Sequence, residues 1–207
     1  MEELEYEYIS RPSAPKKGRI WPALLSMGVM LVIGIIIFAL TYTPAPGTQR
    51  DPNMPWFVVS DGTLYFDAEY YTGGEELTVP VTVAGQKITA LGEGCFAGTD
   101  KLVTVYLPSS ITTIAEAAFY GCTSLRGILL PEGLLSMGSD VFSDCYALEA
   151  ICIPAGLQEV GVDAFYACDA LRFVFYGGTR EQWKELGLKN FPRNTTIYTS
   201  EDSYPNG

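Results

Sequence analysis

Three cysteines occur at a fixed interval of 23 residues in the second half of this 207-residue chain: Cys122, Cys145 and Cys168. A thiol can serve as a nucleophile, a metal ligand, half of a disulfide or a small buried apolar group. The sequence contains no histidine, which excludes Cys-His and Ser-His mechanisms and histidine-based zinc sites. Inward packing and a disulfide between neighbouring copies both remain open, and the shared interval favours packing.

Several other columns of residues repeat at the same interval, which is the signature of a repeat architecture. They are Leu102, Leu125, Leu148 and Leu171; Phe96, Phe119, Phe142 and Phe165; Pro108, Pro131 and Pro154; and the small residues Gly92, Ala115, Gly138 and Gly161. A side chain in such a column recurs because the fold requires it. We therefore interpret the three cysteines as core residues.

Each repeat unit begins with alternating apolar residues, as in "LVTVYLP" and "LEAICIP", which predict a short strand ended by proline. A short helical or turn segment follows, as in "EAAFYGC", with its phenylalanine facing inward. A unit of 23 residues cannot bury an apolar face alone, but stacked units place strands about 4.8 Å apart and share one core. The predicted fold class is a repeat solenoid of short strands and short helical turns.

The two ends of the predicted solenoid depart from the repeat, as terminal caps must. The segment "FVVSDGTLYFDAEYY" predicts a hairpin that turns at Asp61-Gly62 and caps the first rung. An irregular first copy follows, with five residues inserted near "AGQK". At the other end, "TREQWKELGL" predicts a short helix with Thr179 as N-cap and Gln182 in the capping-box position. A last strand is expected near residues 195–198.

Residues 56–200 resemble the bacterial surface leucine-rich repeat arrays of the BspA-like family. The resemblance rests on "LVTVYLPSSITTIAEAAFYGCTS", its two following copies and the closing segment "YGGTREQW". It implies a curved leucine-rich repeat solenoid displayed outside a bacterial cell, in a family for some of whose members adhesion or binding to host and matrix components is suggested. It implies no catalytic residue and no cofactor, because the family motif is a packing motif.

The segment from Ile20 to Tyr42 carries no charged residue. At about 1.5 Å per residue it extends about 34 Å, enough for a bilayer core of about 30 Å. It predicts one transmembrane helix, with a cleaved signal peptide as the alternative. The basic residues before it orient the N-terminus to the cytoplasm by the positive-inside rule; they are Arg11, Lys16, Lys17 and Arg19.

The predicted organisation is a cytoplasmic tail at 1–19, a membrane helix at 20–42, a Pro-rich spacer at 43–55, the repeat domain at 56–200 and a tail at 201–207. Outside the membrane, residues 51–207 hold 20 acidic and 8 basic residues. Their net charge of −12 disfavours binding to nucleic acid or anionic glycans. The carboxylates are scattered, without the spacing of a calcium loop or a pairing that would serve glycan hydrolysis. We expect no metal, no cofactor and no enzymatic activity.

Strand alternation separates inward residues such as Val105 and Ile128 from those that face outward. The outward positions carry an apolar, partly aromatic strip, which is the candidate partner-binding site: Tyr106, Leu129, Cys152, Phe173 and Phe175. Alternatively, a loop, the C-terminal helix or a second copy of the chain covers this strip. We expect a membrane-anchored, extracytoplasmic module that binds a protein or glycan; a structural envelope spacer or an assembly partner of another membrane protein is the alternative.

Overall fold

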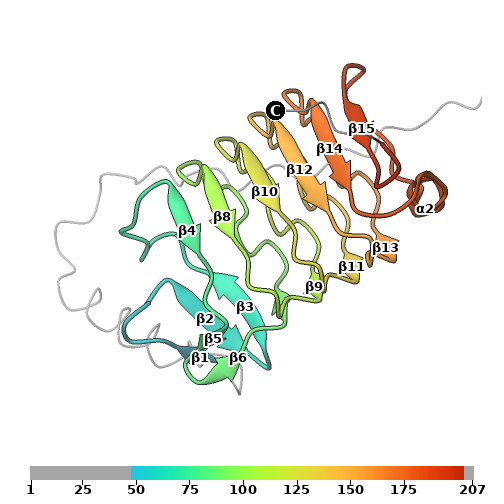
Figure 1. Ribbon diagram of the computed structural model, residues 1–207. Helices are drawn as coiled ribbons and strands as arrows, with labels where there is room; N and C mark the ends of the chain where they lie inside the picture. Colours follow the sequence, from blue (N-terminus) through green and yellow to red (C-terminus); the bar gives the residue numbers. More distant parts are fainter. Residues whose placement is uncertain (1–47, 203–207) are drawn as a thin grey trace, which may run out of the picture. The chain divides into compact units, whose positions relative to one another are not determined.

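The computed structural model describes residues 48–202, and these residues form the predicted solenoid. Each rung contributes a strand to a six-stranded sheet, and most rungs contribute a second strand to a seven-stranded sheet. Figure 1 shows the six-stranded sheet running across the front of the stack from β4 to β15. The leucine-rich repeat solenoid predicted from the 23-residue columns is therefore confirmed.

The six-stranded sheet is parallel throughout, in the order β15-β14-β12-β10-β8-β4. Residues 23 apart lie opposite one another, so that Ile128 of β10 pairs with Val105 and with Ile151. The columns of the sequence are therefore columns in space. The strands are β4 (Glu76–Thr78), β8 (Thr104–Tyr106), β10 (Gly127–Leu129), β12 (Ala150–Ile153), β14 (Phe173–Tyr176) and β15 (Thr196–Tyr198).

The seven-stranded sheet is a feature that the sequence analysis does not predict. Its repeat strands are only two residues long, too short for an alternation pattern to reveal, and bonds between rungs such as Gly138 N–H to Ile114 O (2.8 Å) hold them. In sheet order the strands are β1 (Gln49–Arg50), β2 (Phe57–Ser60), β3 (Thr63–Phe66), β7 (Ala90–Leu91), β9 (Thr113–Ile114), β11 (Ser136–Met137) and β13 (Glu159–Val160).

The segment that carries each phenylalanine is a turn. The sequence left a short helix and a turn open for this segment, and the helical interpretation is wrong. The backbone of this segment bonds to the next rung, as from Phe119 N–H to Val141 O (2.9 Å) and from Phe142 N–H to Ala164 O (2.8 Å). Two residues in every such turn have a left-handed backbone conformation with positive φ, which no right-handed helix accommodates. The first column is Gly94, Ala117, Asp140 and Asp163, and the second is Gly98, Gly121, Asp144 and Ala167.

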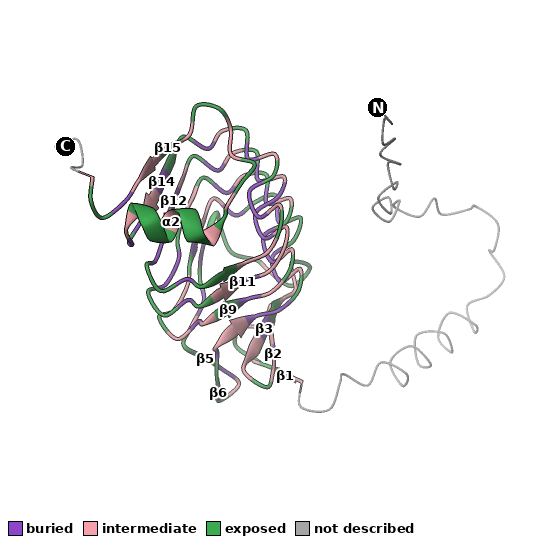
Figure 2. Cartoon of the chain, turned by 90° about the vertical axis from the view of Figure 1, so that its right-hand side faces the viewer, coloured by how far each residue is buried: buried purple, intermediate pink, exposed green. Residues whose placement is uncertain are grey.

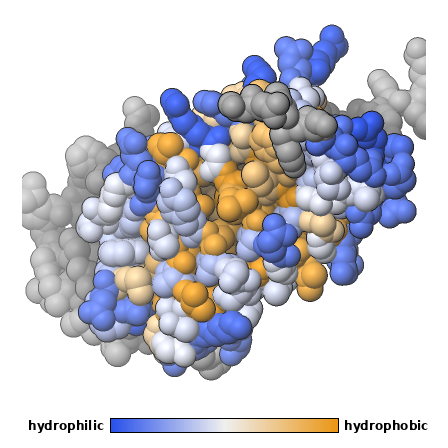
Figure 3. Space-filling model, viewed as in Figure 1, coloured by the Kyte–Doolittle hydropathy of each residue, from blue (hydrophilic) through white to orange (hydrophobic). Residues whose placement is uncertain are grey.

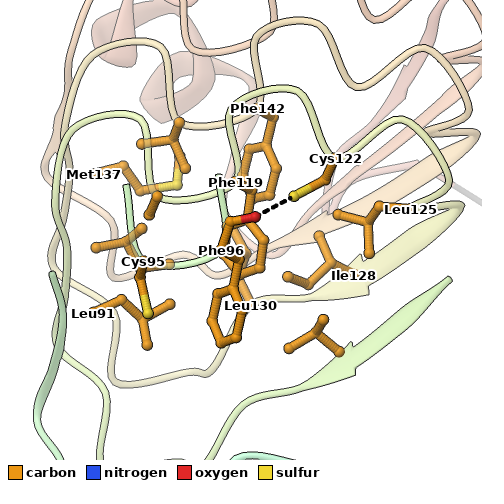
Figure 4. Close-up of a cluster of buried hydrophobic side chains, with 14 of the residues drawn as sticks. Leu91, Cys95, Phe96, Phe119, Cys122, Leu125, Ile128, Leu130, Met137 and Phe142 are labelled. Carbon is orange, nitrogen blue, oxygen red and sulfur yellow. Dashed lines mark hydrogen bonds between the residues drawn. The ribbon is translucent and has the colours of Figure 1, made fainter. Parts of the chain in front are cut away.

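Stacked phenylalanines run through the core between the two sheets. The ring centroids of Phe96 and Phe119 are 5.0 Å apart, those of Phe119 and Phe142 5.2 Å, and those of Phe142 and Phe165 5.6 Å. All four side chains are fully buried. Figure 2 shows buried residues recurring at equivalent places in successive rungs, and Figure 4 shows three of these rings in line. The predicted inward-facing column is confirmed.

Close approach of neighbouring backbones explains two members of the small-residue column, Gly138 and Gly161. A Cβ atom at Gly138 would lie 2.4 Å from the Glu116 nitrogen, and one at Gly161 would lie 2.2 Å from the Ser139 nitrogen. No side chain fits at those distances without moving the adjacent rung. Gly92 is confined differently, because a Cβ there would meet the ring of Tyr65.

The N-terminal cap is the predicted hairpin, in which β2 and β3 pair antiparallel. Asp61 and Gly62 both have positive φ, as the two central residues of a type I′ turn require. Strand β3 then pairs in parallel with β7 and covers the first rung. The five inserted residues form a small hairpin of β5 (Thr82–Val83) and β6 (Gln86–Lys87). Strand β1 lies within the predicted spacer, where it pairs with β2.

The C-terminal cap contains helix α2 (Arg180–Leu186) with the predicted Thr179–Gln182 capping box. Trp183 packs against the rings of Tyr176 (5.4 Å) and Phe191 (5.8 Å). Strand β15 follows at the predicted place. The predicted membrane segment, residues 20–42, lies outside the described residues, as does the tail at 1–19. Within residues 48–202, no helix has both the length and the apolar character needed to cross a bilayer.

Candidate partner-binding face

The outward face of the six-stranded sheet brings all five predicted strip residues together. Register places Tyr106, Leu129, Cys152 and Phe175 side by side on β8, β10, β12 and β14. Phe173 lies two residues before Phe175 on the same face. Leu129 is 67% exposed, Tyr106 50% and Phe173 44%, whereas Cys152 and Phe175 are partly buried. Figure 3 shows apolar side chains gathered across the middle of this face.

One aromatic residue extends the strip beyond the predicted set. Tyr198 of β15 stands next to Phe175 in the sheet register. Their rings are stacked with centroids 5.4 Å apart and planes 11° apart, and Phe173 lies 6.3 Å from Phe175 and 6.5 Å from Tyr198. The predicted last strand near residues 195–198 could have revealed Tyr198, because its register with β14 places Tyr198 beside the outward-facing Phe175. The strip therefore ends in a cluster of three aromatic rings.

A shallow cavity of about 190 Å³ adjoins the strip where the strands end. Leu129, Cys152 and Phe175 contribute to its lining together with Pro154. Glu132 is the one charged side chain among the residues that line it. A cavity of this kind fits an apolar side chain that reaches over the edge of the sheet.

Charged groups lie beside the strip but not within it. Arg126 and Glu149, which precede β10 and β12, form an exposed ion pair with an N–O distance of 3.9 Å. Arg172, which precedes β14, donates to the backbone oxygen of Asp169 (3.0 Å). Burial raises the pKa of the Cys152 thiol, so this strip residue is a neutral thiol near pH 7. The strip is an uncharged, apolar surface; Arg126, Glu149 and Arg172 precede its strands, and Glu132 follows β10.

The cysteine column does not form a reactive site. Each thiol donates to the backbone oxygen of the phenylalanine one rung before it: Cys122 to Phe96 (3.1 Å), Cys145 to Phe119 (3.1 Å) and Cys168 to Phe142 (3.0 Å). Figure 4 shows the first of these bonds. All five cysteines are free thiols, so packing is confirmed over a disulfide, and the hydrogen bonds are an addition that the sequence did not reveal.

The electrostatics of two buried thiols, Cys168 and Cys95, agree with a packing role. Burial raises the pKa of Cys168 to about 12 and raises the pKa of Cys95 as well. A thiol in such a setting is not ionised at neutral pH and is a poor nucleophile or metal ligand. In the part of the chain that the structure describes, no three His, Cys, Asp or Glu side chains are placed to hold a metal ion.

Residues 73–195 match the family model described as "BspA type Leucine rich repeat region", in six copies. The matched segment covers more than half of the chain. No functionally curated protein matches the sequence. The family model thus identifies the same repeat that the register of the sheets displays.

Solved structures of bacterial leucine-rich repeat proteins share the fold. A T. pallidum leucine-rich repeat protein is 26% identical with a TM-score of 0.51, over 76% of this chain and 64% of that one. A protein from Bacteroides capillosus is 25% identical with a TM-score of 0.53, over 64% of this chain and 99% of that one. One from Bacteroides ovatus is 25% identical with a TM-score of 0.48, over 76% and 34%. The match therefore spans less than two thirds of the first and third of these proteins.

Proposed function

The chain belongs to the BspA-type leucine-rich repeat family, and on that basis we propose that it is a membrane-anchored module that binds a protein ligand outside the cell. The observation that carries the proposal is the exposed apolar strip of Tyr106, Leu129, Cys152, Phe173 and Phe175 on one rigid sheet. Rigid aromatic and aliphatic side chains surrounded by charged ones are typical of the energetic centre of a protein interface.

The chemistry of the strip favours a protein over a glycan as its ligand. Among the five side chains, the only polar groups are the hydroxyl of Tyr106 and the thiol of Cys152. A sugar surrounded by hydroxyl groups would lose its water there without gaining enough hydrogen bonds in return. An apolar side chain of a protein loses nothing in that exchange, and the cavity beside Leu129 and Phe175 accommodates one.

Anchoring of the module rests on the sequence of the N-terminal segment. The uncharged residues 20–42 and the basic residues before them support a single membrane helix with a cytoplasmic N-terminus. The predicted Pro-rich spacer at 43–55 follows this segment in the sequence, and its residues 49–50 form β1 in the N-terminal cap.

The proposal is tested by removing the strip without disturbing the core. The full chain in proteoliposomes is used to capture proteins from envelope and host fractions, and the triple variant Tyr106→Ser, Leu129→Ser, Phe175→Ser is compared with it. A double variant of exposed apolar residues elsewhere, Leu135→Ser with Val162→Ser, serves as the control. Loss of a captured protein in the triple variant alone supports the proposal. Equal capture by all three proteins defeats it and favours the alternative of an assembly partner.

A further inference from the structure

The phenylalanine-bearing turns of successive rungs form layers, and backbone hydrogen bonds join each layer to the next. These bonds stop at the last layer, which contains Asp163 and Ala167. The N–H groups in the first left-handed column donate to the next layer, from Gly94 to Glu116 O (3.0 Å), Ala117 to Ser139 O (2.9 Å) and Asp140 to Val162 O (3.0 Å). Those in the second column do likewise, from Gly98 to Tyr120 O (2.8 Å), Gly121 to Ser143 O (2.8 Å) and Asp144 to Tyr166 O (2.9 Å).

The equivalent residues of the last layer, Asp163 and Ala167, have no acceptor for their N–H groups within residues 48–202. The next rung is interrupted by α2, and the chain returns only at Asn190 and Phe191. The Phe191 ring stacks on Phe165 with centroids 5.2 Å apart. The cap thus continues the apolar column but supplies no backbone carbonyl to the two N–H groups. Asp163 and Ala167 are both partly buried, and a backbone donor without a protein acceptor takes another partner, such as water or a ligand.

A cavity of about 420 Å³ opens beside these two residues, between the last layer and the cap. We call it the cap cavity. It is lined by Asp163, Tyr166, Ala167, Cys168, Asp169, Asn190, Phe191 and Pro192. Its volume lies within the range of about 300–1,000 Å³ found for small-molecule sites.

The lining offers donors, acceptors and aromatic surface together. The amide of Asn190 donates to Asp163 Oδ1 (2.5 Å), which leaves the remaining carboxylate lone pairs as acceptors. The Asp169 carboxylate adds two more acceptor oxygens. In the described part of the chain, neither Asp163 nor Asp169 takes part in an ion pair. Tyr166 and Phe191 supply rings.

This combination selects for a ligand with hydroxyl groups around an apolar ring face. A hydroxyl accepts from a backbone N–H and donates to a carboxylate, and the C–H face of a sugar ring packs on an aromatic side chain. A purely apolar ligand would leave the carboxylates unpaired, and a lone basic side chain would leave the two N–H donors unpaired. Acidic sugars are disfavoured because the two carboxylates in the lining, Asp163 and Asp169, would repel them.

We propose that the cap cavity binds a neutral hexopyranose unit of a glycan. This inference goes beyond the protein-binding strip, since it concerns a different surface and a different class of ligand. The backbone N–H groups of Asp163 and Ala167 donate to sugar oxygens. The carboxylates of Asp163 and Asp169 accept from sugar hydroxyls, and Tyr166 lies against the ring.

The test is a titration of the ¹⁵N-labelled full chain with the methyl glycosides of glucose, galactose, mannose and N-acetylglucosamine. At least one glycoside is expected to shift the amide resonances of Asp163 and Ala167 in a saturable manner. The change Tyr166→Ser should weaken that binding at least tenfold. The change Tyr120→Ser, at the same position of the layer two rungs earlier, should leave it unaltered, and Asp169→Asn provides a second weakening variant should Tyr166→Ser fail to fold.

Two results would overturn the proposal. The first is that none of the four glycosides moves these amides up to about 50 mM, a concentration at which even millimolar binding saturates. The second is a larger shift with N-acetylarginine amide than with any sugar, because the cavity would then be a site for basic peptides. Neither result bears on the strip, so the two proposals fail independently.

Discussion

The sulfur of Cys145 lies 3.1 Å from the backbone oxygen of Phe119 and donates a hydrogen bond to it across the rungs. Cys122 and Cys168 repeat the same bond to Phe96 and Phe142. Because each bond joins the cysteine of one rung to the phenylalanine of the rung before, the two columns are coupled. The thiol therefore supplies a hydrogen bond as well as apolar volume.

Changing Cys145 separates these two contributions. Cys145→Ala removes the sulfur and the donor and should lower the free energy of unfolding by about 2 kcal/mol. Cys145→Ser retains a donor to Phe119 and should cost about 1 kcal/mol. Urea denaturation of the unaltered protein and the two variants measures the order of their free energies of unfolding. A serine variant less stable than the alanine variant would show that the site is purely apolar.

Thiol labelling distinguishes the cysteine on the outward sheet face, Cys152, from the buried cysteines of the core. Cys152 is the one cysteine that is not fully buried, so a maleimide should modify one thiol per native chain and all five after denaturation. Its raised pKa leaves little thiolate at neutral pH, and the rate should therefore climb as the pH rises toward that pKa. Cys152→Ser should abolish native labelling. Modification of two or more thiols in the native protein would contradict the burial described for the column.

The left-handed columns predict a stabilising substitution. Ala117 has a φ of 55°, a conformation that costs an alanine about 1–2 kcal/mol and a glycine almost nothing. Glycine also adds entropy to the unfolded chain, which offsets part of this relief, so the net gain from Ala117→Gly should be about 0.5–1 kcal/mol. The neighbouring Ala118 is fully buried and does not have positive φ, and Ala118→Gly should destabilise. Thermal denaturation compares each variant with the unaltered protein. A lower midpoint for Ala117→Gly than for the unaltered protein would be incompatible with the turn geometry.

The close approach of neighbouring rungs predicts a contrast between two glycines. Gly161→Ala would place a Cβ atom 2.2 Å from a backbone nitrogen, whereas at Gly127 the nearest atom is 3.6 Å away. We expect Gly161→Ala to cost about 3 kcal/mol or more and Gly127→Ala to change stability by less than about 1 kcal/mol. Denaturant midpoints measure both. Similar losses at the two sites would mean that the rungs separate easily.

The sequence predicts those parts of the structure in which residues recur. The interval of 23 residues implies that Ile128 lies between Val105 and Ile151, and the sheet register has that arrangement. The interval also places the strip residues on one face. The hairpin turn at Asp61-Gly62 and the helix N-cap at Thr179 follow from local residue preferences that act independently of the repeat.

Other parts depend on contacts that no pattern of the sequence records. The two-residue strands of the second sheet, such as β9, exist only because adjacent rungs bond to them. The cap cavity requires Asn190 and Phe191 to return beside Asp163, and these residues lie outside the repeat columns of the sequence analysis. The hydrogen bonds of the thiols depend on tenths of an ångström in the spacing of the rungs. Periodicity therefore predicts the stack, and packing determines the details.

The most direct measurement is site-specific photo-crosslinking from the strip. A photoreactive amino acid replaces Leu129, the most exposed residue of the strip, in the full chain on the cell surface, and Leu135 in a second protein serves as the control. We expect a discrete protein adduct from position 129 and none of that mass from position 135. An absence of any adduct at 129, or the same adduct from both positions, would contradict the assignment of the binding face.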